Sequence, residues 1–222
     1  MIVARSMDPS WLSNAFVVGD EPGGVALFVD TGAPLAPLLA AIEEHRLTPT
    51  HVLRTHTHTD HIVHEDEVCE RFGIPVVTGP VTSGGLAVEA IATPGHSDDG
   101  VAFLVNGSLL FSGDTLFKDA VGGGPADEVR ASVEKLLALP PETRVLPGHT
   151  DETTIGRERE ENPFARFWSG VAPADGRRCT VGDVTATLLV WSPDYDGKGK
   201  VLVRFDDGTE RILGASRVAI TD

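Results

Sequence analysis

The amino-acid sequence predicts an α/β fold followed by a small all-β appendage, and three observations support this. The chain has 222 residues, of which 41% are hydrophobic, and this is enough for one sizeable core. Before residue 170, strand-like apolar runs alternate with segments of helical apolar spacing. After Gly170 the strand-like runs are short and are joined by polar turns that contain Asp-Gly. We therefore expect a main α/β unit over 1–169 and a β-rich appendage over 170–222.

The first half of the main unit is expected to contain a β-hairpin and two helices. The hairpin turns at Glu21-Pro22-Gly23-Gly24, and Gly73 ends the second helix. The predicted elements are strands at 15–18, 25–29, 51–54 and 75–77, and helices at 35–46 and 62–72.

The second half of the main unit is expected to continue with strands before and after one amphipathic helix. That helix opens with Asp127 and Glu128, which suit a helix N-terminus, and stops at Pro140-Pro141. The predicted elements are strands at 86–91, 101–105 and 145–146, the helix at 125–139 and a helical turn at 162–168. In the appendage, strands are expected at 185–190, 200–205 and 211–213, and they faintly resemble those of SH3-like or Tudor-like barrels. Trp191 is expected to lie in the core of the appendage or, alternatively, to form a wall of a substrate cleft.

The segment Arg54-Thr55-His56-Thr57-His58-Thr59-Asp60-His61 contains three imidazoles and one carboxylate within six positions. Alternate side chains of an extended segment point the same way, so His56 and His58 can converge on one point. Asp60 and His61 follow where the chain turns, so they can face a second point close by. Such polar side chains need partners when they are buried, which makes packing a poor explanation for this cluster.

Three further ligand-type residues follow strand-like runs, each directly after a glycine. His96 follows Thr93-Pro94-Gly95, Asp114 follows Ser112-Gly113, and His149 follows Pro147-Gly148. Glycine permits a tight turn that frees the next side chain from the sheet, and functional residues gather on such loops. Four motifs of this kind in one chain favour a metal site over scattered polar loop residues.

The remaining histidines and both cysteines are expected to be structural or exposed. His45 and His51 fit surface positions, and His64 fits a position beside the site better than a ligand role. Cys69 and Cys179 have no CxxC partner, so we expect structural thiols in a reducing, cytoplasmic location. The sequence shows no secretion signal and no membrane-length apolar stretch. A formal net charge of −15 disfavours nucleic-acid partners.

These four motifs together resemble those of the metallo-β-lactamase superfamily over roughly residues 10–168. The segment Gly113-Asp114-Thr115-Leu116-Phe117 most closely resembles the corresponding motif of the glyoxalase II branch, the hydroxyacylglutathione hydrolases. The resemblance implies an αββα sandwich with the metals at one edge, between the two sheets. It also implies that Asp30, in Val29-Asp30-Thr31-Gly32, supports the site without binding metal.

The resemblance implies a site for two divalent metal ions. His56, His58 and His96 would hold one ion, Asp60, His61 and His149 the other, and Asp114 would bridge them. This imidazole and carboxylate set suits zinc, the expected ion, with iron or manganese as alternatives. Asp60 and Asp114 are the predicted catalytic residues, Asp60 because it could orient the attacking hydroxide or relay its proton.

Three departures from the family pattern argue against glutathione as the thiol carrier. Ile62-Val63 stands where Gly-Gly often follows Asp-His, and Gly122-Gly123-Gly124 stands where a glutathione-contacting Lys or Arg is expected. Thr150-Asp151 replaces an aromatic residue after the last histidine. The β appendage also takes the place of a helical C-terminal domain.

The sequence therefore predicts a metallo-hydrolase, a thioesterase or esterase that cleaves a small thioester or ester with a metal-bound hydroxide. Two alternatives stay open. A persulfide dioxygenase would hold a single iron on His56 or His58 with His96 and Asp114. A non-catalytic binding protein could share the fold. Expected partners are small-molecule substrates only, with no nucleic acid and no membrane, and the sequence does not indicate an oligomeric state.

Overall fold

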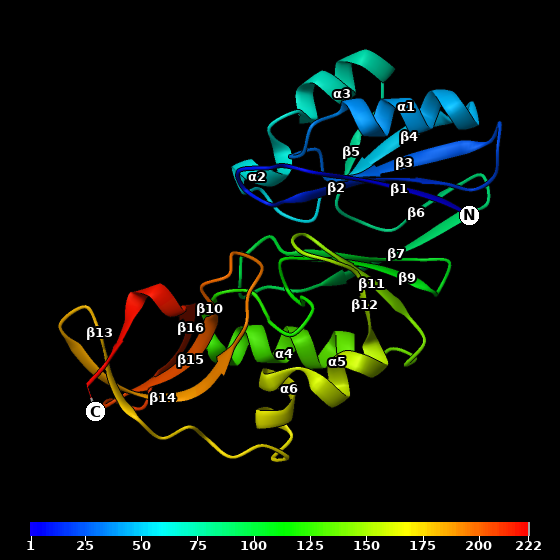
Figure 1. Ribbon diagram of the computed structural model, residues 1–222. Coiled ribbons are helices and arrows are strands. Elements are labelled where there is room, and N and C mark those ends of the chain that lie inside the picture. Colours follow the sequence, from blue (N-terminus) through cyan, green and yellow to red (C-terminus); the bar gives the residue numbers. More distant parts are fainter. Residues whose placement is uncertain (222) are drawn as a thin grey trace.

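Two β-sheets packed face to face form the centre of the protein (Figure 1). The structure is a computed structural model that describes residues 1–221. Side chains that alternate along one strand enter two different cores. Phe16 and Val18 lie between the sheets, whereas Ala15 and Val17 pack against helices on the outer face. Because both faces of these strands are buried, their sequences are apolar throughout rather than alternating.

The first sheet has five strands in the order β1-β2-β3-β4-β5. Their bounds are β1 Ile2–Met7, β2 Asn14–Gly19, β3 Val25–Val29, β4 Thr48–Leu53 and β5 Val76–Val77. Helices α1 (Ala36–His45) and α3 (Glu65–Phe72) cover its outer face through Leu38, Ile42 and Val68. The predicted hairpin and the helix at 35–46 are confirmed.

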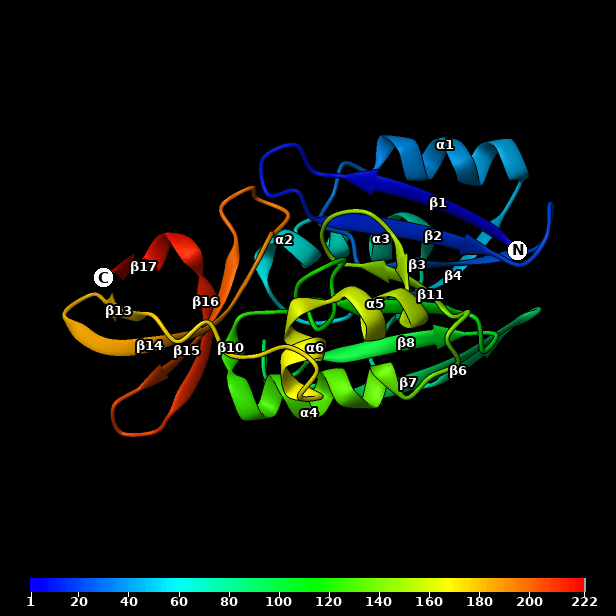
Figure 2. The same ribbon diagram turned by 60° about the horizontal axis from the view of Figure 1, so that its bottom comes forward.

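The second sheet has six strands in the order β12-β11-β9-β8-β7-β6. Their bounds are β6 Val81–Ser83, β7 Leu86–Ala92, β8 Val101–Val105, β9 Leu109–Gly113, β11 Arg144–Pro147 and β12 Thr153–Thr154. Helices α4 (Ala126–Leu137), α5 (Ile155–Glu161) and α6 (Pro163–Trp168) cover its outer face (Figure 2). The layers are therefore helix, sheet, sheet, helix, which confirms the αββα sandwich.

The predicted helix over 62–72 is wrong at its start, because the chain breaks there into two helices. Helix α2 (Thr59–Ile62) begins directly after His58, and α3 begins only at Glu65. Between them, the His64 amide donates to the carbonyl of Thr31, whose own amide donates to the carbonyl of His61. These tertiary bonds tie α2 to the turn after β3 and interrupt the continuous helix that local spacing suggests. Strand β1 and helix α5 were not predicted.

A third sheet, the C-terminal sheet, has the strand order β10-β16-β15-β14-β13-β17. The bounds are β10 Gly124–Pro125, β13 Arg178–Val181, β14 Val184–Ser192, β15 Lys200–Phe205, β16 Glu210–Gly214 and β17 Val218–Ile220, with a short 3-10 helix, Ala215–Arg217, before β17. The three strands predicted here are present as β14, β15 and β16. Strand β10 belongs to the main unit and pairs through Gly124 with Ile212. The division at residue 170 and the closure of this sheet as a barrel stay predictions.

The C-terminal sheet shares a hydrophobic core with the main unit. Leu189, Val190, Leu202 and Ile212 belong to the same buried cluster as α4 and α6, while Leu188 and Val203 belong to a separate core on the other side of the sheet. Trp191 belongs to neither core and is 52% exposed, so its expected place in the core is wrong. The sheet is thus packed onto the main unit by apolar contact.

Two smaller expectations concern thiols and membranes. Both cysteines are free, and Cys179 is buried while Cys69 is half-buried. No helix in residues 1–221 is long and apolar enough to span a membrane.

Leu202→Ala should lower the free energy of unfolding by ~2–5 kcal/mol, because Leu202 is fully buried in the core shared by the two units. Urea denaturation followed by circular dichroism measures this loss. Val184→Ala, at an exposed position of the same sheet, should change the value by less than ~0.5 kcal/mol. Separate unfolding of the C-terminal sheet at lower urea would contradict the shared core.

Candidate metal centre

The four predicted ligand motifs lie at strand ends that meet at one edge of the sandwich. Strands β7 and β9 both pair antiparallel with β8, and β11 pairs parallel with β9, so these three strands run the same way. Their carboxyl ends therefore deliver His96, Asp114 and His149 to the same edge of the second sheet. The end of β4, in the first sheet, delivers the segment from His56 to His61 to the opposite side of this edge.

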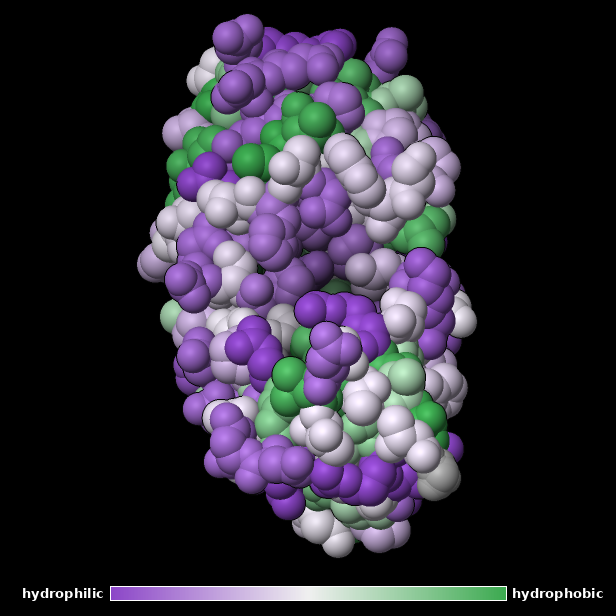
Figure 3. Space-filling model, turned by 90° about the vertical axis from the view of Figure 1, so that its left-hand side faces the viewer, coloured by the Kyte–Doolittle hydropathy of each residue, from purple (hydrophilic) through white to green (hydrophobic). Residues whose placement is uncertain are grey.

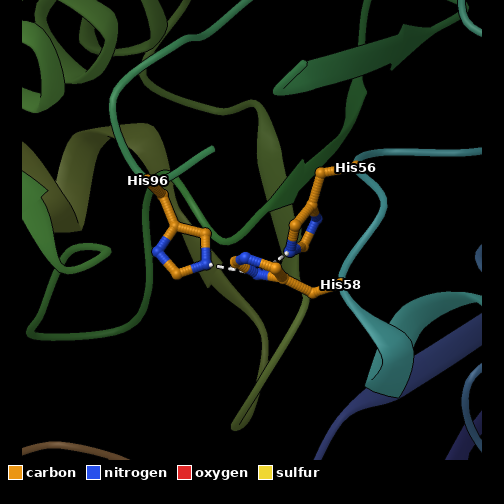
Figure 4. Close-up of side chains that lie close together, drawn as sticks. All are labelled: His56, His58 and His96. Carbon is orange, nitrogen blue, oxygen red and sulfur yellow. Dashed lines mark hydrogen bonds between the residues drawn. The ribbon is translucent and has the colours of Figure 1, made fainter. Parts of the chain in front are cut away.

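The first group of side chains consists of His56, His58 and His96. The Nδ1 atom of His58 lies 3.0 Å from Nε2 of His56 and 3.1 Å from Nε2 of His96 (Figure 4). One ring nitrogen from each of the three histidines lies within 4.8 Å of those of the other two. His56 is buried and His58 is exposed, so this group is open to solvent on one side.

The second group consists of Asp60, His61 and His149. The Oδ2 atom of Asp60 lies 3.6 Å from Nε2 of His61 and 3.4 Å from Nε2 of His149. Both histidines are buried, whereas the Asp60 side chain is 25% exposed. Asp60 is therefore the carboxylate of the centre with the better access to solvent.

Asp114 lies between the two groups and contacts both. Its Oδ2 is 3.4 Å from Nε2 of His96 and 3.3 Å from Nε2 of His149, and its Oδ1 is 3.4 Å from Nε2 of His61. Its side chain is only 7% exposed. The structure thus brings all seven predicted residues together, with Asp114 in the position that joins the two groups.

Asp30 fixes the orientation of the buried ligand side chains. Its Oδ1 accepts from the Thr55 amide at 2.8 Å, and its Oδ2 accepts from the Thr55 hydroxyl at 2.8 Å and from Nδ1 of His61 at 2.9 Å. A proton held on Nδ1 leaves Nε2 of His61 as the atom that faces the centre. This arrangement agrees with the supporting role that the sequence resemblance implied for Asp30.

Two other histidines are oriented in the same way. Nδ1 of His56 lies 3.0 Å from the Thr55 hydroxyl, and Nδ1 of His96 lies 3.1 Å from the carbonyl of Gly123. Because the Thr55 hydroxyl donates to Asp30, its oxygen can accept from His56. The Gly122-Gly123-Gly124 segment, which the sequence marked only as a departure, thus holds a ligand histidine.

Buried polar atoms without partners show that the centre fits a metal ion. Nε2 of His61 and Oδ1 of Asp114 face each other and have no hydrogen bond among residues 1–221. Unpaired buried donors and acceptors are costly, and a cation between them would satisfy both. Gly148 is required beside them, because a Cβ atom there would lie 2.2 Å from Oδ1 of Asp114. Nitrogen and carboxylate donors suit zinc or iron.

The histidines of the two groups differ in their pKa values and therefore in whether they carry a proton at pH 7. Burial lowers the pKa of His56 to about 4 and also lowers the pKa of His96, so both are neutral at pH 7. Burial alone would lower the pKa of His149, but Asp114 and Asp60 raise it to about 9. His61 behaves in the same way: despite burial, Asp114 and Asp30 hold its pKa well above the usual range. His61 and His149 therefore carry protons at neutral pH when no cation compensates the carboxylates.

The sequence missed one wall of the centre, which the C-terminal sheet supplies. The ring of Tyr195, in the β14–β15 loop, stacks on His149 with centroids 4.0 Å apart and planes 6° apart. In Figures 1 and 2 this orange loop rises from the C-terminal sheet towards α2. The segment Asp194-Tyr195-Asp196-Gly197 was predicted only as a turn. The single tyrosine of the chain, placed in a polar turn, was the one available signal.

The surface over the centre is hollowed and hydrophilic. Figure 3 shows hydrophilic residues around a hollow between the part of the molecule that carries the first sheet and the part formed by the C-terminal sheet.

Of the residues considered as alternatives, His64 lies outside the three ligand groups and pairs with Glu67 at 3.6 Å. That His64 is not a ligand stays a prediction.

Comparison with known proteins identifies the family and several relatives. A family model described as the metallo-beta-lactamase superfamily matches residues 9–84 and 78–149. An uncharacterized protein of Mycobacterium tuberculosis is 33% identical over 205 residues, covering 68% of this chain and 92% of the relative. A Bacillus subtilis protein named "Probable metallo-hydrolase YqgX" is 32% identical, with 69% and 92% covered. A hydroxyacylglutathione hydrolase of Xylella fastidiosa is 38% identical, but only 58% of this chain and 56% of that protein are covered.

Solved structures share the same architecture. BLEG-1, a B3 metallo-beta-lactamase, has a TM-score of 0.68 at 28% identity, covering 74% of this chain and 99% of that chain. ETHE1 from Myxococcus xanthus has a TM-score of 0.66 at 30% identity, with 74% and 85% covered. TTHA1623 in a di-iron-bound form has a TM-score of 0.61 at 32% identity, with 72% and 98% covered.

Binding of two Zn²⁺ ions at pH 7 should release about two protons, because His61 and His149 must lose theirs to bind. Calorimetric titration of metal-free protein in two buffers with different ionisation enthalpies measures this release. Affinity should rise with pH up to about 9, the pKa of His149. His149→Gln should release about one proton fewer. Equal heats in both buffers would show that these histidines are neutral before binding.

Asp30→Asn should weaken metal binding by about 10–100-fold, because the amide cannot accept from both Thr55 and His61. Competition with a chromogenic chelator measures the affinity. Asp20→Asn is the matched control, since Asp20 follows β2 and accepts backbone amides at a turn away from the centre. Unchanged affinity in Asp30→Asn would mean that His61 is oriented by other contacts.

Proposed function

This chain belongs to the metallo-β-lactamase superfamily, and on that premise we propose that it is a metal-dependent hydrolase that cleaves a small thioester or ester. The observation that carries the proposal is the convergence of five imidazoles and two carboxylates into overlapping groups joined by Asp114. A structural site for one ion would need only four of these side chains.

We assign one ion to His56, His58 and His96, and a second to Asp60, His61 and His149, with Asp114 shared between them. Asp114 supports this assignment because its two oxygens approach histidines of both groups. Bound divalent ions in such a site lower the pKa of water and polarise a carbonyl oxygen. Zinc is the proposed ion, and the di-iron form of TTHA1623 keeps iron as an alternative.

Asp60 is proposed to orient the attacking water. Burial would raise its pKa, but the hydrogen bond from His149 and the charge of His61 lower it, so the carboxylate is ionised at neutral pH. An ionised carboxylate accepts hydrogen bonds. Its partial exposure lets it reach a water molecule and exchange a proton with solvent. Asp114, being buried, is left to hold the two groups together.

The substrate proposal rests on the partial likeness to a hydroxyacylglutathione hydrolase, a thioesterase by name, over 148 residues. The match covers just over half of that protein, so its carrier does not transfer to this chain. The C-terminal sheet supplies a different wall, with Tyr195 over His149. We therefore propose a small acyl thioester with a carrier other than glutathione, or a related ester. A cytoplasmic location stays a prediction.

Asp114→Asn should reduce hydrolysis at least 10³-fold, because loss of the shared charge misplaces both groups of ligands. Wild-type and variant proteins loaded with Zn²⁺ are compared on a panel of acyl thioesters and aryl esters, with metal content measured in parallel. Asp98→Asn, an exposed carboxylate close in sequence to His96, is the control and should keep full activity.

The same assay separates the proposed hydrolase from a persulfide dioxygenase. Oxygen uptake and sulfite formation on a persulfide by iron-loaded protein, with no hydrolysis of any thioester or ester in the panel, would replace the hydrolase proposal. The hydrolase proposal is supported by the convergence of Asp60, His61 and His149 into a second group beside the first, which a single-iron site would not need.

A further inference from the structure

The β14–β15 loop of the C-terminal sheet forms part of the metal centre. Tyr195 stacks flat on His149, and Phe117 is edge-on to both rings. The ring centroid of Phe117 lies 5.6 Å from that of Tyr195 and 5.8 Å from that of His149. Phe117 is buried and lies three residues after Asp114. Tyr195 therefore contacts both a proposed metal ligand and a buried residue of the segment that follows Asp114.

A buried ion pair holds this loop in place. Nζ of Lys200 lies 3.0 Å from Oδ2 of Asp194, and the two side chains are only 12% and 4% exposed. The same ammonium lies 5.7 Å from the ring centre of Tyr195 and 6.0 Å from that of Phe117, within the range of cation–π attraction. Removing one partner would leave the other charge buried without compensation, which is strongly unfavourable. The pair thus closes the loop and fixes Tyr195 above the centre.

A second anchor connects the loop to the main unit. The hydroxyl of Ser192, at the end of β14, donates to the carbonyl of Asp119. Asp119 is itself held by Arg157 at 2.7 Å and by an amide hydrogen bond to the buried Glu158 at 2.9 Å. The loop is therefore tied down at both ends, at Ser192 and at Lys200.

The phenol group of Tyr195 has no hydrogen-bond partner among residues 1–221, although its ring is packed on His149. A phenol is protonated at neutral pH and can donate one hydrogen bond. Tyrosine at the edge of a polar cleft combines a rigid apolar ring with such a donor. Since the ring that carries it stacks on His149, this unpaired donor is available to a molecule bound beside that ring.

We propose that the C-terminal sheet completes the active site through Tyr195, whose ring covers His149 and whose hydroxyl donates to an oxygen of the bound substrate. The covering of His149 stands independently of the reaction, whereas the hydrogen bond to substrate rests on the proposed hydrolase function. Tyr195 is thus a substrate-binding residue contributed from outside the sandwich.

The single tyrosine allows the covering of His149 to be tested without any assay of activity. Protein labelled with 3-fluorotyrosine should give one fluorine signal, and Tyr195→Phe should remove it. Paramagnetic Co²⁺ should shift or broaden the signal strongly in comparison with Zn²⁺. A signal that Co²⁺ leaves sharp and unshifted would overturn the covering of the centre.

Lys198 in the loop and Lys200 at the start of β15 provide a pair of variants for comparison. Lys200→Met should free the loop and reduce the effect of Co²⁺ on the fluorine signal, because Asp194 loses its partner. Lys198→Ala removes an exposed lysine and should leave the effect unchanged. If Co²⁺ affected the fluorine signal equally in the two variants, the role of the Lys200–Asp194 pair would be contradicted.

Mercaptoacetate and ethanethiol test the hydroxyl group, also without turnover. Both thiols can bind Co²⁺-loaded protein, which visible absorption detects, but only mercaptoacetate carries oxygen acceptors. Tyr195→Phe should weaken mercaptoacetate binding roughly tenfold and leave ethanethiol binding unchanged. With an active thioester, the same variant should lose roughly tenfold in kcat/KM while keeping its metals. If Tyr195→Phe bound mercaptoacetate as tightly as the wild-type protein does, the proposed hydrogen bond would be overturned, whether or not any thioester is hydrolysed.

Discussion

The buried carboxylate of Asp114 is the constraint on which the rest of the centre depends. A charge removed from water needs opposite charge or strong hydrogen bonds close by. Here three imidazoles lie within 3.4 Å of its oxygens. In the metal-free protein, protons on His61 and His149 compensate the charge, and divalent ions would replace those protons. The same crowding leaves room only for glycine at position 148.

Around this charge, the chain uses hydrogen bonds from the first sheet to orient ligands that face the second sheet. Asp30, at the end of β3, holds both Thr55 and His61. Gly32 lets this turn approach closely, since a Cβ there would lie 1.7 Å from the carbonyl oxygen of Asp60. His61, held by Asp30 in this way, faces Asp114 of the second sheet at 3.4 Å, so a polar contact joins the two halves at this edge, whereas apolar packing joins the sheets elsewhere.

Strands β13 to β17 of the C-terminal sheet lie outside the region that the family model matches, which ends at residue 149. The sheet is nevertheless joined to the main unit by a shared core, by the pairing of Gly124 with Ile212, and by Tyr195 on His149. Gly123, next to that paired strand, also holds His96. A change in the position of this sheet would therefore affect ligands of both groups. This coupling gives the appendage a physical route to determine which substrates the centre accepts.

From its residues alone, the sequence predicted the alternating strands and helices of the main unit and the seven candidate ligands, whereas the αββα sandwich and the supporting role of Asp30 came from the family resemblance of those motifs. The strand and ligand predictions depend on local signals: apolar runs of strand length, a glycine before His96, Asp114 and His149, and crowded histidines that packing cannot explain. Only the tertiary structure decided three other features. These are the split of the predicted helix at 62–72, the hydrogen bond between His96 and the Gly123 carbonyl, and the stacking of Tyr195 on His149. Each of these joins segments distant in the chain, and their partners are chosen by the packing of whole sheets. Local spacing carries no information about such pairs, so Tyr195 looks like an ordinary turn residue until the C-terminal sheet is docked.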